Sequence, residues 1–170
     1  MLLRPATTND IPQIAALERN PASSNFVGRW PEERHLATLA NPDARYFVVD
    51  SPGGGIGAFA LLRGLQEASR SIEFKRIVVA TPGQGLGRRI VSELIRIVFD
   101  DLGAHRFYLD VYEDNARARH IYESLGFVYE GIMREAGERN DQFISLHLMS
   151  MLDREYRALT GSPPSSAPPV

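Results

Sequence analysis

A glycine-rich turn between an apolar run and an amphipathic stretch is the feature that most limits how this chain can fold. The turn Gly83-Gln84-Gly85-Leu86-Gly87 follows the apolar residues 77–80 and precedes a helical pattern that starts near Arg88. Glycine lets the backbone turn sharply and approach a ligand closely. The first N–H groups of a helix, at the positive end of its dipole, attract phosphate. A strand, a glycine turn and a helix in this order therefore predict a site for a pyrophosphate-bearing cofactor at residues 83–88.

Two other interpretations of this turn are open. The first is an ordinary connection between a strand and a helix. The second is the turn of a dinucleotide-binding domain, which closes the first strand of a β-α-β series and is followed by an acidic residue about 20 positions later. Asp110 follows Gly87 at a similar spacing. Only one β-α-β unit is visible, however, and the repeated parallel half-domains are missing, which disfavours this second interpretation.

Composition narrows the class of protein. The chain has 170 residues, of which 44% are hydrophobic and 24% are charged, as is typical of one soluble globular domain. A formal net charge of −2 does not favour nucleic acid as a partner. No apolar run reaches the roughly 18 residues that cross a bilayer, and the N-terminus lacks the pattern of a signal peptide. We therefore expect a cytoplasmic protein with no nucleic-acid or membrane partner.

Cysteine and histidine usage limits the chemistry that the chain can perform. Cysteine is absent, which excludes disulfides, thiolate catalysis and cysteine metal sites and fits a reducing compartment. His35, His105 and His147 lack the spacing of metal ligands, and His120 is expected on a solvated helix surface. We therefore expect no metal.

Hydrophobic periodicity predicts a mixed α+β fold with a mostly antiparallel central sheet of six to seven strands and helices on both faces. Strands are expected at residues 2–4, 46–49, 56–63, 71–79, 106–112, 127–134 and 142–151, with the runs between 46 and 112 spaced as an antiparallel meander. Helices are expected around Pro12 and at residues 31–40, 87–102 and 115–125. The folded domain is expected to span residues 1–159, and the Pro- and Ser-rich residues 160–170 are expected to be disordered.

A second motif, at residues 110–127, combines a strand, an Asn-capped helix and the ending Tyr122-Glu123-Ser124-Leu125-Gly126-Phe127. Together with the preceding glycine turn, this motif resembles the GNAT superfamily of acyl-CoA-dependent N-acetyltransferases. The opening Leu3-Arg4-Pro5-Ala6-Thr7 also resembles that family. The closing stretch Glu130-Gly131-Ile132-Met133-Arg134 and residues 152–156 resemble the branch that contains the ribosomal-protein N-terminal acetyltransferases. The resemblance covers about residues 2–157 and is specific for the superfamily but not for the substrate.

The chain departs from the family pattern at one position of the glycine turn. Pro82 stands where the family usually has Arg or Gln. Proline has no N–H group to donate, so the cradle would rely on the amides of residues 83–88. We expect cofactor binding to survive, with altered contacts.

The resemblance implies acetyl-CoA as co-substrate and direct acetyl transfer to a primary amine of a small molecule or a protein N-terminus. It implies cofactor contacts from the end of the strand, the glycine turn and the Asn-capped helix, namely Ile77, Val78, Val79, Gly83, Gln84, Gly85, Leu86, Gly87, Arg88, Asn115 and Ala118. For Asn115, an ordinary N-cap is the alternative interpretation.

Three side chains are candidates for catalysis. A carboxylate can remove the proton that an attacking amine carries at neutral pH, and Glu73 and Asp110 are both candidates for this base. The resemblance implies that Tyr122 lies near the CoA sulfur and acts as general acid. The alternatives are ion-paired or exposed strand carboxylates and, for Tyr122, core packing against Phe127.

Several features leave the acceptor and the assembly open. Phe26, Trp30 and Tyr46 can form either the acceptor wall or the core, and loops with Glu67, Glu135 and Glu138 can flank the acceptor groove. A homodimer through the sheet edges at residues 127–134 or 142–151 is plausible. The alternative to an enzyme is a non-catalytic acyl-CoA-binding sensor or scaffold.

Overall fold

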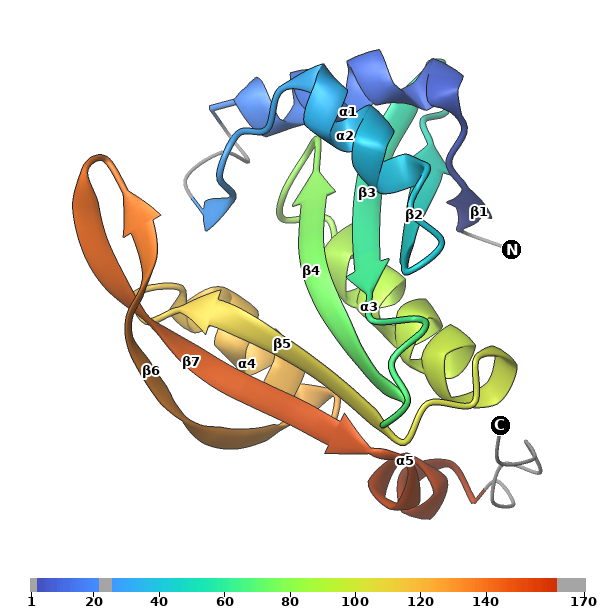
Figure 1. The fold of residues 1–170 in the computed structure, drawn as a ribbon, viewed down its shortest axis with the longest axis vertical. Coiled ribbons are helices and arrows are strands. Elements are labelled where there is room, and N and C mark those ends of the chain that lie inside the picture. Colours follow the sequence, from blue (N-terminus) through green and yellow to red (C-terminus); the bar gives the residue numbers. More distant parts are fainter. Residues whose placement is uncertain (1–2, 22–25, 162–170) are drawn as a thin grey trace. The chain divides into compact units, whose positions relative to one another are not determined.

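A computed structural model describes residues 3–21 and 26–161, and it contains the predicted mixed α+β fold (Figure 1). Seven strands form one sheet in the order β1-β2-β3-β4-β5-β7-β6. The strands are β1 (Arg4–Pro5), β2 (Ala44–Asp50), β3 (Ile56–Arg63), β4 (Ser71–Val79), β5 (Arg106–Tyr112), β6 (Val128–Arg139) and β7 (Gln142–Leu152). The helices are α1 (Ile11–Arg19), α2 (Glu32–Leu39), α3 (Leu86–Arg96), α4 (Ala116–Ser124) and α5 (Asp153–Thr160). The predicted tail beyond residue 161 lies outside the described residues.

The chain divides into two compact units. The first unit comprises Met1–Gln66 and Lys75–Leu94, and the second comprises Glu67–Phe74 and Ile95–Val170. Strand β4 contributes to both units.

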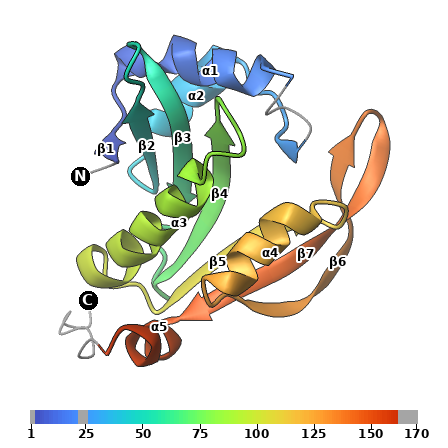
Figure 2. The same cartoon turned by 180° about the vertical axis from the view of Figure 1, so that it is seen from behind.

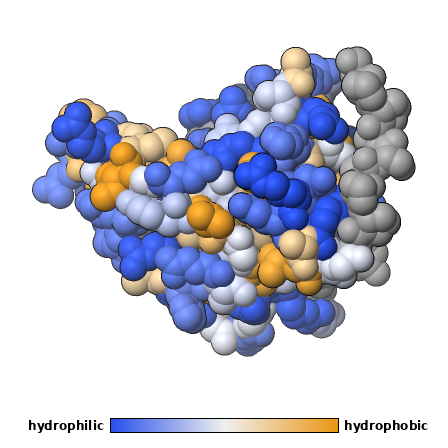
Figure 3. All heavy atoms as spheres, turned by 90° about the horizontal axis from the view of Figure 1, so that it is seen from below, coloured by the Kyte–Doolittle hydropathy of each residue, from blue (hydrophilic) through white to orange (hydrophobic). Residues whose placement is uncertain are grey.

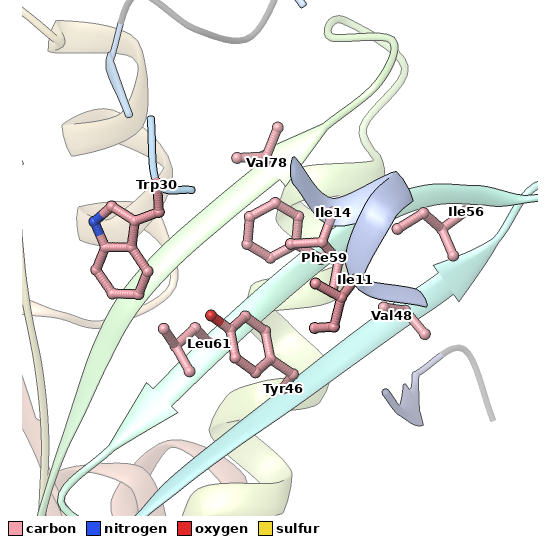
Figure 4. Packing of buried hydrophobic residues seen from close by; sticks show 9 residues of the cluster. All are labelled: Ile11, Ile14, Trp30, Tyr46, Val48, Ile56, Phe59, Leu61 and Val78. Carbon is pink, nitrogen blue, oxygen red and sulfur yellow. The ribbon is translucent and has the colours of Figure 1, made fainter. Parts of the chain in front are cut away.

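In the first unit, helices cover both faces of the β2–β3 hairpin. Strand β1 pairs with β2, and β2 pairs with β3, both antiparallel. Helices α1 and α2 lie on one face, and the first part of α3 lies on the other (Figures 1 and 2). Five consecutive residues of β3, 58–62, are fully buried because neither face meets solvent. The core beneath α1 contains Ile11, Ile14, Trp30, Tyr46, Val48, Ile56, Phe59, Leu61 and Val78 (Figure 4).

In the second unit, β5 pairs in parallel with the first residues of β4 and antiparallel with β7. The parallel pairing of Ile72 with Phe107 corrects the expected antiparallel meander through residue 112. The reason is that α3 separates β4 from β5 in the chain, and a helical crossover returns the next strand in the same direction. Helix α4 lies against β5 in both views (Figures 1 and 2). Its Tyr122 packs on Phe74 and Phe127.

The predicted helix at residues 87–102 changes its geometry near its end. Regular α-helix stops at Arg96, and a π-helical turn follows at Ile97–Asp101. Ile97, Val98 and Phe99 are all buried, although a helix of 3.6 residues per turn does not place three consecutive residues on one face. The π-turn widens the buried face at this point.

Two further differences concern the C-terminal third of the chain. Helix α5 was not predicted. Strand β6 continues to Arg139, so the turn to β7 contains only Asn140 and Asp141, both with positive φ angles, 53° and 60°. Asn and Asp tolerate the left-handed conformation that a two-residue hairpin turn requires, so this short turn suffices to connect the strands. As a result, Glu135 and Glu138 lie within β6 and not in a loop.

Candidate active site

The glycine turn in the first unit has the geometry of an anion cradle. Gly83 and Gly85 adopt positive φ angles of 99° and 75°. An added Cβ at either position would meet nothing within 4 Å, so the backbone conformation, and not a lack of space, requires glycine there. Residues 81–85 are exposed, Pro82 among them, and the turn can therefore receive a ligand.

Helix α3 begins directly after this turn with its positive end available to an anion. Its first hydrogen bond connects the Arg89 N–H to the Gly85 carbonyl at 3.2 Å, so the amides of Leu86 and Gly87 precede the helical ladder. The first turn of α3 contains no acidic residue. Together these features fit the binding of a pyrophosphate.

Strand β4 leads into the turn, and its last residue contacts the start of α3. Val78 is buried in the first-unit core, whereas Ile77 and Val79 are partly exposed. An added Cβ on Gly87 would lie 3.8 Å from Val79 Cγ2, so the helix start packs closely on the strand end. The predicted cofactor residues of the first unit are thus continuous in the structure.

The second unit brings the two candidate bases to one face of neighbouring strands. Glu73 on β4 is paired with Tyr108 on β5, and Asp110 follows Tyr108 by two residues. Paired residues and alternate residues of a strand share a face of the sheet. The pairing of β4 with β5 ends at Glu73 and Tyr108, so Asp110 lies just beyond the paired part of β5. Both side chains are half-buried.

Tyr122 on α4 packs in the core of the second unit. Only 7% of it is exposed, and its ring meets Phe127 edge-on at a centroid distance of 5.8 Å, as the core-packing interpretation predicted. Burial and, secondly, the negative charge of Asp110 raise the pKa of the Tyr122 phenol well above its usual value. Tyr122 therefore keeps its proton at neutral pH and can donate a hydrogen bond to a developing anion.

Asn115 caps helix α4, as the ordinary interpretation predicted. Its Oδ1 accepts a hydrogen bond from the Ala118 N–H at 3.1 Å. Ala118 is partly exposed and His120 is exposed.

A buried polar cluster in the first unit was missed by the sequence analysis. Glu18 and His35 are fully buried, and the Glu18 carboxylate accepts a hydrogen bond from the Trp30 N–H at 2.7 Å and pairs with Arg76. His35 Nδ1 lies 2.8 Å from the Tyr46 hydroxyl. The available signal was an acidic residue, Glu18, on the apolar stripe of its helix.

The structure also separates the residues proposed for either the acceptor wall or the core. Trp30 and Tyr46 belong to the core, whereas Phe26 is 39% exposed. Among residues 3–21 and 26–161, no group of three or more potential ligands gathers as a metal site. Within the same ranges, no helix is long and apolar enough to cross a membrane.

Sequence comparison shows that this chain is similar to known acetyltransferases. The family described as acetyltransferase (GNAT) domain matches residues 1–128. Spermidine N(1)-acetyltransferase of Vibrio cholerae is 31% identical over 92% of this chain and 95% of its own length. The N-alpha-acetyltransferase RimI of Mycobacterium tuberculosis is 32% identical over 75% of this chain and 78% of its own length.

Solved structures give the same result. The crystal structure of Vibrio cholerae spermidine N-acetyltransferase in complex with CoA and spermine has a TM-score of 0.80 at 26% identity, covering 91% of this chain and 96% of that one. A mutant of the same enzyme has a TM-score of 0.81, covering 94% and 99%. The specific resemblance to the ribosomal-protein branch is not supported by these relatives. The chain belongs to the GNAT acetyltransferase family, and it is an enzyme that transfers an acetyl group from acetyl-CoA to a primary amine.

Proposed function

We propose that the acceptor of this acetyltransferase is a polyamine of the spermidine class. The observation that carries the proposal is the pair of carboxylates, Glu73 and Asp110, on one face of neighbouring strands. Carboxylates attract a polycation and can also remove its proton. The similarity to spermidine N-acetyltransferases over nearly the whole chain supports the same class.

The proposed reaction needs a base because the attacking amine is protonated at neutral pH. An amine with a pKa of about 10.4 is neutral in only about 0.04% of molecules at pH 7. Glu73 or Asp110 takes this proton, directly or through water, and the neutral amine nitrogen forms a bond to the thioester carbonyl carbon while the carbon–sulfur bond breaks. The nitrogen then loses a second proton, which passes to the departing CoA thiolate, so that the products are the amide and CoA thiol. Either carboxylate can serve, and both remain candidates.

Tyr122 is proposed to stabilise the sulfur that leaves. Its raised pKa makes full proton transfer to a thiolate unfavourable, since a thiol has a pKa of only about 8.5. A short hydrogen bond from the phenol still stabilises the developing negative charge. The role of Tyr122 is therefore donation of a hydrogen bond more than release of a proton.

The donor is proposed to bind at the strand end, the glycine turn and the start of α4. Acetyl-CoA supplies the activated acetyl thioester. The residues proposed to hold it are Ile77, Val78, Val79, Gly83, Gln84, Gly85, Leu86, Gly87, Arg88, Asn115 and Ala118. The positive φ angles of Gly83 and Gly85 and the acid-free first turn of α3 support the pyrophosphate part of this assignment.

Assembly and location form two further parts of the proposal. Strand β6 stands at the end of the sheet order and carries the exposed apolar side chains of Val128, Tyr129 and Ile132. The face drawn in Figure 3 is mostly hydrophilic, with hydrophobic residues in a few separate patches. We propose a cytoplasmic homodimer in which β6 contributes to the contact, and light scattering after gel filtration tests its mass.

The function is tested by a thiol-release assay with acetyl-CoA against spermidine, spermine and short peptides with free N-termini. Spermidine or spermine should be acetylated, and Tyr122→Phe should lower kcat about 10- to 100-fold while calorimetry shows unchanged acetyl-CoA binding. Acetylation of peptides alone would favour the protein N-terminus, which the similarity to RimI makes the second candidate. Binding without thiol release from any amine would favour the acyl-CoA sensor.

A further inference from the structure

Strand β5, in the second unit, has one face in the core and one face outside it. The residues at 107, 109 and 111 are buried. The residues that alternate with them are half-buried and form what we call the open face, namely Arg106, Tyr108, Asp110 and Tyr112. Alternate residues of a strand point to the same side of the sheet. Asp110, one of the two candidate bases, therefore stands between two tyrosines on the open face.

The charge of Asp110 acts at the point where the leaving group is proposed to lie. After burial, that charge is the second cause of the raised pKa of the Tyr122 phenol. Because the interaction between charges weakens with distance, Asp110 lies near the hydroxyl that is proposed to stabilise the departing sulfur. The reacting amine is therefore expected near Asp110, and a neighbour of Asp110 on the open face can contact another part of the same acceptor.

The hairpin of β6 and β7 holds the ring of Tyr112 in place. Tyr112 is paired with Leu146 on β7, and Leu146 is paired with Met133 on β6. The register then shifts, and the next paired residue of β6 is Gly137. An added Cβ on Gly137 would lie 3.0 Å from Tyr112 Cε1 and 3.1 Å from Leu146 Cδ2, closer than the roughly 3.5–4.0 Å at which carbon atoms pack. Glycine at this position therefore leaves the space that the Tyr112 ring occupies.

The tyrosine rings of the open face already contact cations. The guanidinium carbon of Arg139 lies 5.3 Å from the centroid of the Tyr112 ring. That of Arg106 lies 5.2 Å from the centroid of the Tyr108 ring. Both distances are within the range of about 6 Å over which the face of an aromatic ring attracts a cation. Tyr112 is only half-buried, so part of its side chain remains accessible to a ligand.

An aromatic ring beside a carboxylate is a combination suited to ammonium groups. The carboxylate attracts the positive charge and accepts hydrogen bonds, and the ring attracts the charge without taking the proton. The Cα atoms of Asp110 and Tyr112 are about 6–7 Å apart along the strand. A polyamine carries further ammonium groups at the end of short alkyl chains, whereas a monoamine carries none. The open face therefore offers one contact to the reacting amine and another to a second ammonium group.

We propose that Tyr112 determines the specificity for the acceptor, because its ring binds an ammonium group of the polyamine that does not react. The reacting amine then lies at the candidate bases, and Gly137 positions the ring. This inference rests on the proposed function. It predicts that the enzyme favours a polyamine over a monoamine, since only the polyamine supplies the second cation.

The test is steady-state kinetics of Tyr112→Leu with spermidine and with butylamine, which has a single amine. Loss of the ring should lower kcat/KM for spermidine about 5- to 10-fold, mainly through KM. The values of kcat/KM for butylamine and KM for acetyl-CoA should stay within about twofold of the wild type. Tyr112→Phe keeps the ring and loses only a long hydrogen bond, 3.5 Å from the hydroxyl to the Glu138 carbonyl, so it should behave as the wild type.

The matched control is Phe143→Leu on β7, which also replaces an aromatic ring with leucine. Phe143 is 71% exposed and stands an odd number of residues from Leu146, so its side chain points to the other side of the sheet. This variant should change neither kcat/KM nor the KM for acetyl-CoA. If butylamine is acetylated too slowly to measure, the KM for spermidine decides, raised in Tyr112→Leu and unchanged in Tyr112→Phe and Phe143→Leu.

Three results would overturn the proposal. They are an unchanged kcat/KM for spermidine in Tyr112→Leu, an equal fall for spermidine and butylamine, and an equal fall in Tyr112→Leu and Tyr112→Phe. Should Tyr112→Leu fail to fold, Gly137→Ala takes its place, because the added Cβ displaces the ring and should raise the KM for spermidine. Absence of polyamine turnover in the wild type would overturn the proposed function and this inference together. Polyamine turnover that does not depend on the ring at position 112 overturns this inference alone.

Discussion

The two units of this chain fill their cores with different chemistry. The core beneath α1 contains a buried glutamate and histidine and a partly buried arginine, whereas the core beneath α4 is a set of aromatic rings formed by Phe74, Phe99, Phe107, Phe127 and Tyr122. Charges of the second unit stay toward the surface, as in the pair of Arg106 and Glu130. An aromatic core stabilises mainly through the large apolar area that it buries. A buried ion pair contributes less to stability, but removing one partner of the pair is strongly destabilising.

The largest effect on the free energy of unfolding is expected from a substitution in the aromatic core of the second unit. Phe107 is fully buried and its ring lies 5.6 Å from Phe127 and 5.8 Å from Phe74. Phe107→Ala should lower the free energy of unfolding by about 3–5 kcal/mol, because it removes a ring and leaves a cavity. Urea denaturation measures this loss. Phe143→Ala, at a position 71% exposed, is the control and should change the free energy of unfolding by less than about 0.5 kcal/mol.

The next largest effect on stability is expected at the ion pair of Glu18 and Arg76 in the first unit. Arg76→Met leaves the Glu18 charge buried without its cation and should cost about 3 kcal/mol of stability. The double variant Glu18→Leu with Arg76→Met should recover most of that loss, because it removes both charges. A double variant that stays as unstable as Arg76→Met would contradict this account.

A smaller effect is expected at the cap of α4. Asn115→Ala removes the acceptor for the Ala118 N–H and should lower the free energy of unfolding by about 1 kcal/mol. Asn115→Asp keeps a cap and serves as the control for stability. If Asn115→Asp retains stability while its affinity for acetyl-CoA in calorimetry falls, the side chain also contacts the donor. Unchanged affinity in both variants would limit Asn115 to capping.

The smallest effect concerns how much stability the protein loses at low pH. The hydrogen bonds from Arg106 and Ser150 hold the pKa of the Glu130 carboxyl below its usual value. Because this pKa is lower in the folded than in the unfolded chain, the contribution is complete above about pH 5 and is lost as pH falls through the folded value. Glu130→Gln should therefore narrow the stability difference between pH 7 and pH 3, by less than about 1 kcal/mol since the pair is partly exposed. An equal acid loss in wild type and variant would contradict this.

The features that were predicted from sequence depend on neighbours in the chain. The glycine turn, the cap at Asn115 and most of the strands were visible because glycine spacing, capping residues and alternation are local signals. The fold class followed from these elements together. The π-turn was missed because its residues continue an apolar pattern, and α5 was missed because it is short and polar.

The buried cluster could not be predicted because its partners are distant in the chain. Glu18 lies 12 positions from Trp30 and 58 positions from Arg76, and no periodicity connects them. An acid on an apolar stripe indicates that a partner exists without naming it. The roles of Glu73, Asp110 and Tyr122 stay predictions, although the structure places the two carboxylates on one face.

The π-helical turn at Ile97–Asp101 has a consequence for how relatives of this chain should be aligned. A π-turn accommodates one extra residue within a helix, and each residue of an α-helix rotates the side-chain direction by about 100°. A relative without that residue would keep the same core with its sequence shifted by one position after the turn. An alignment drawn without a gap there would pair buried residues such as Phe99 with surface positions.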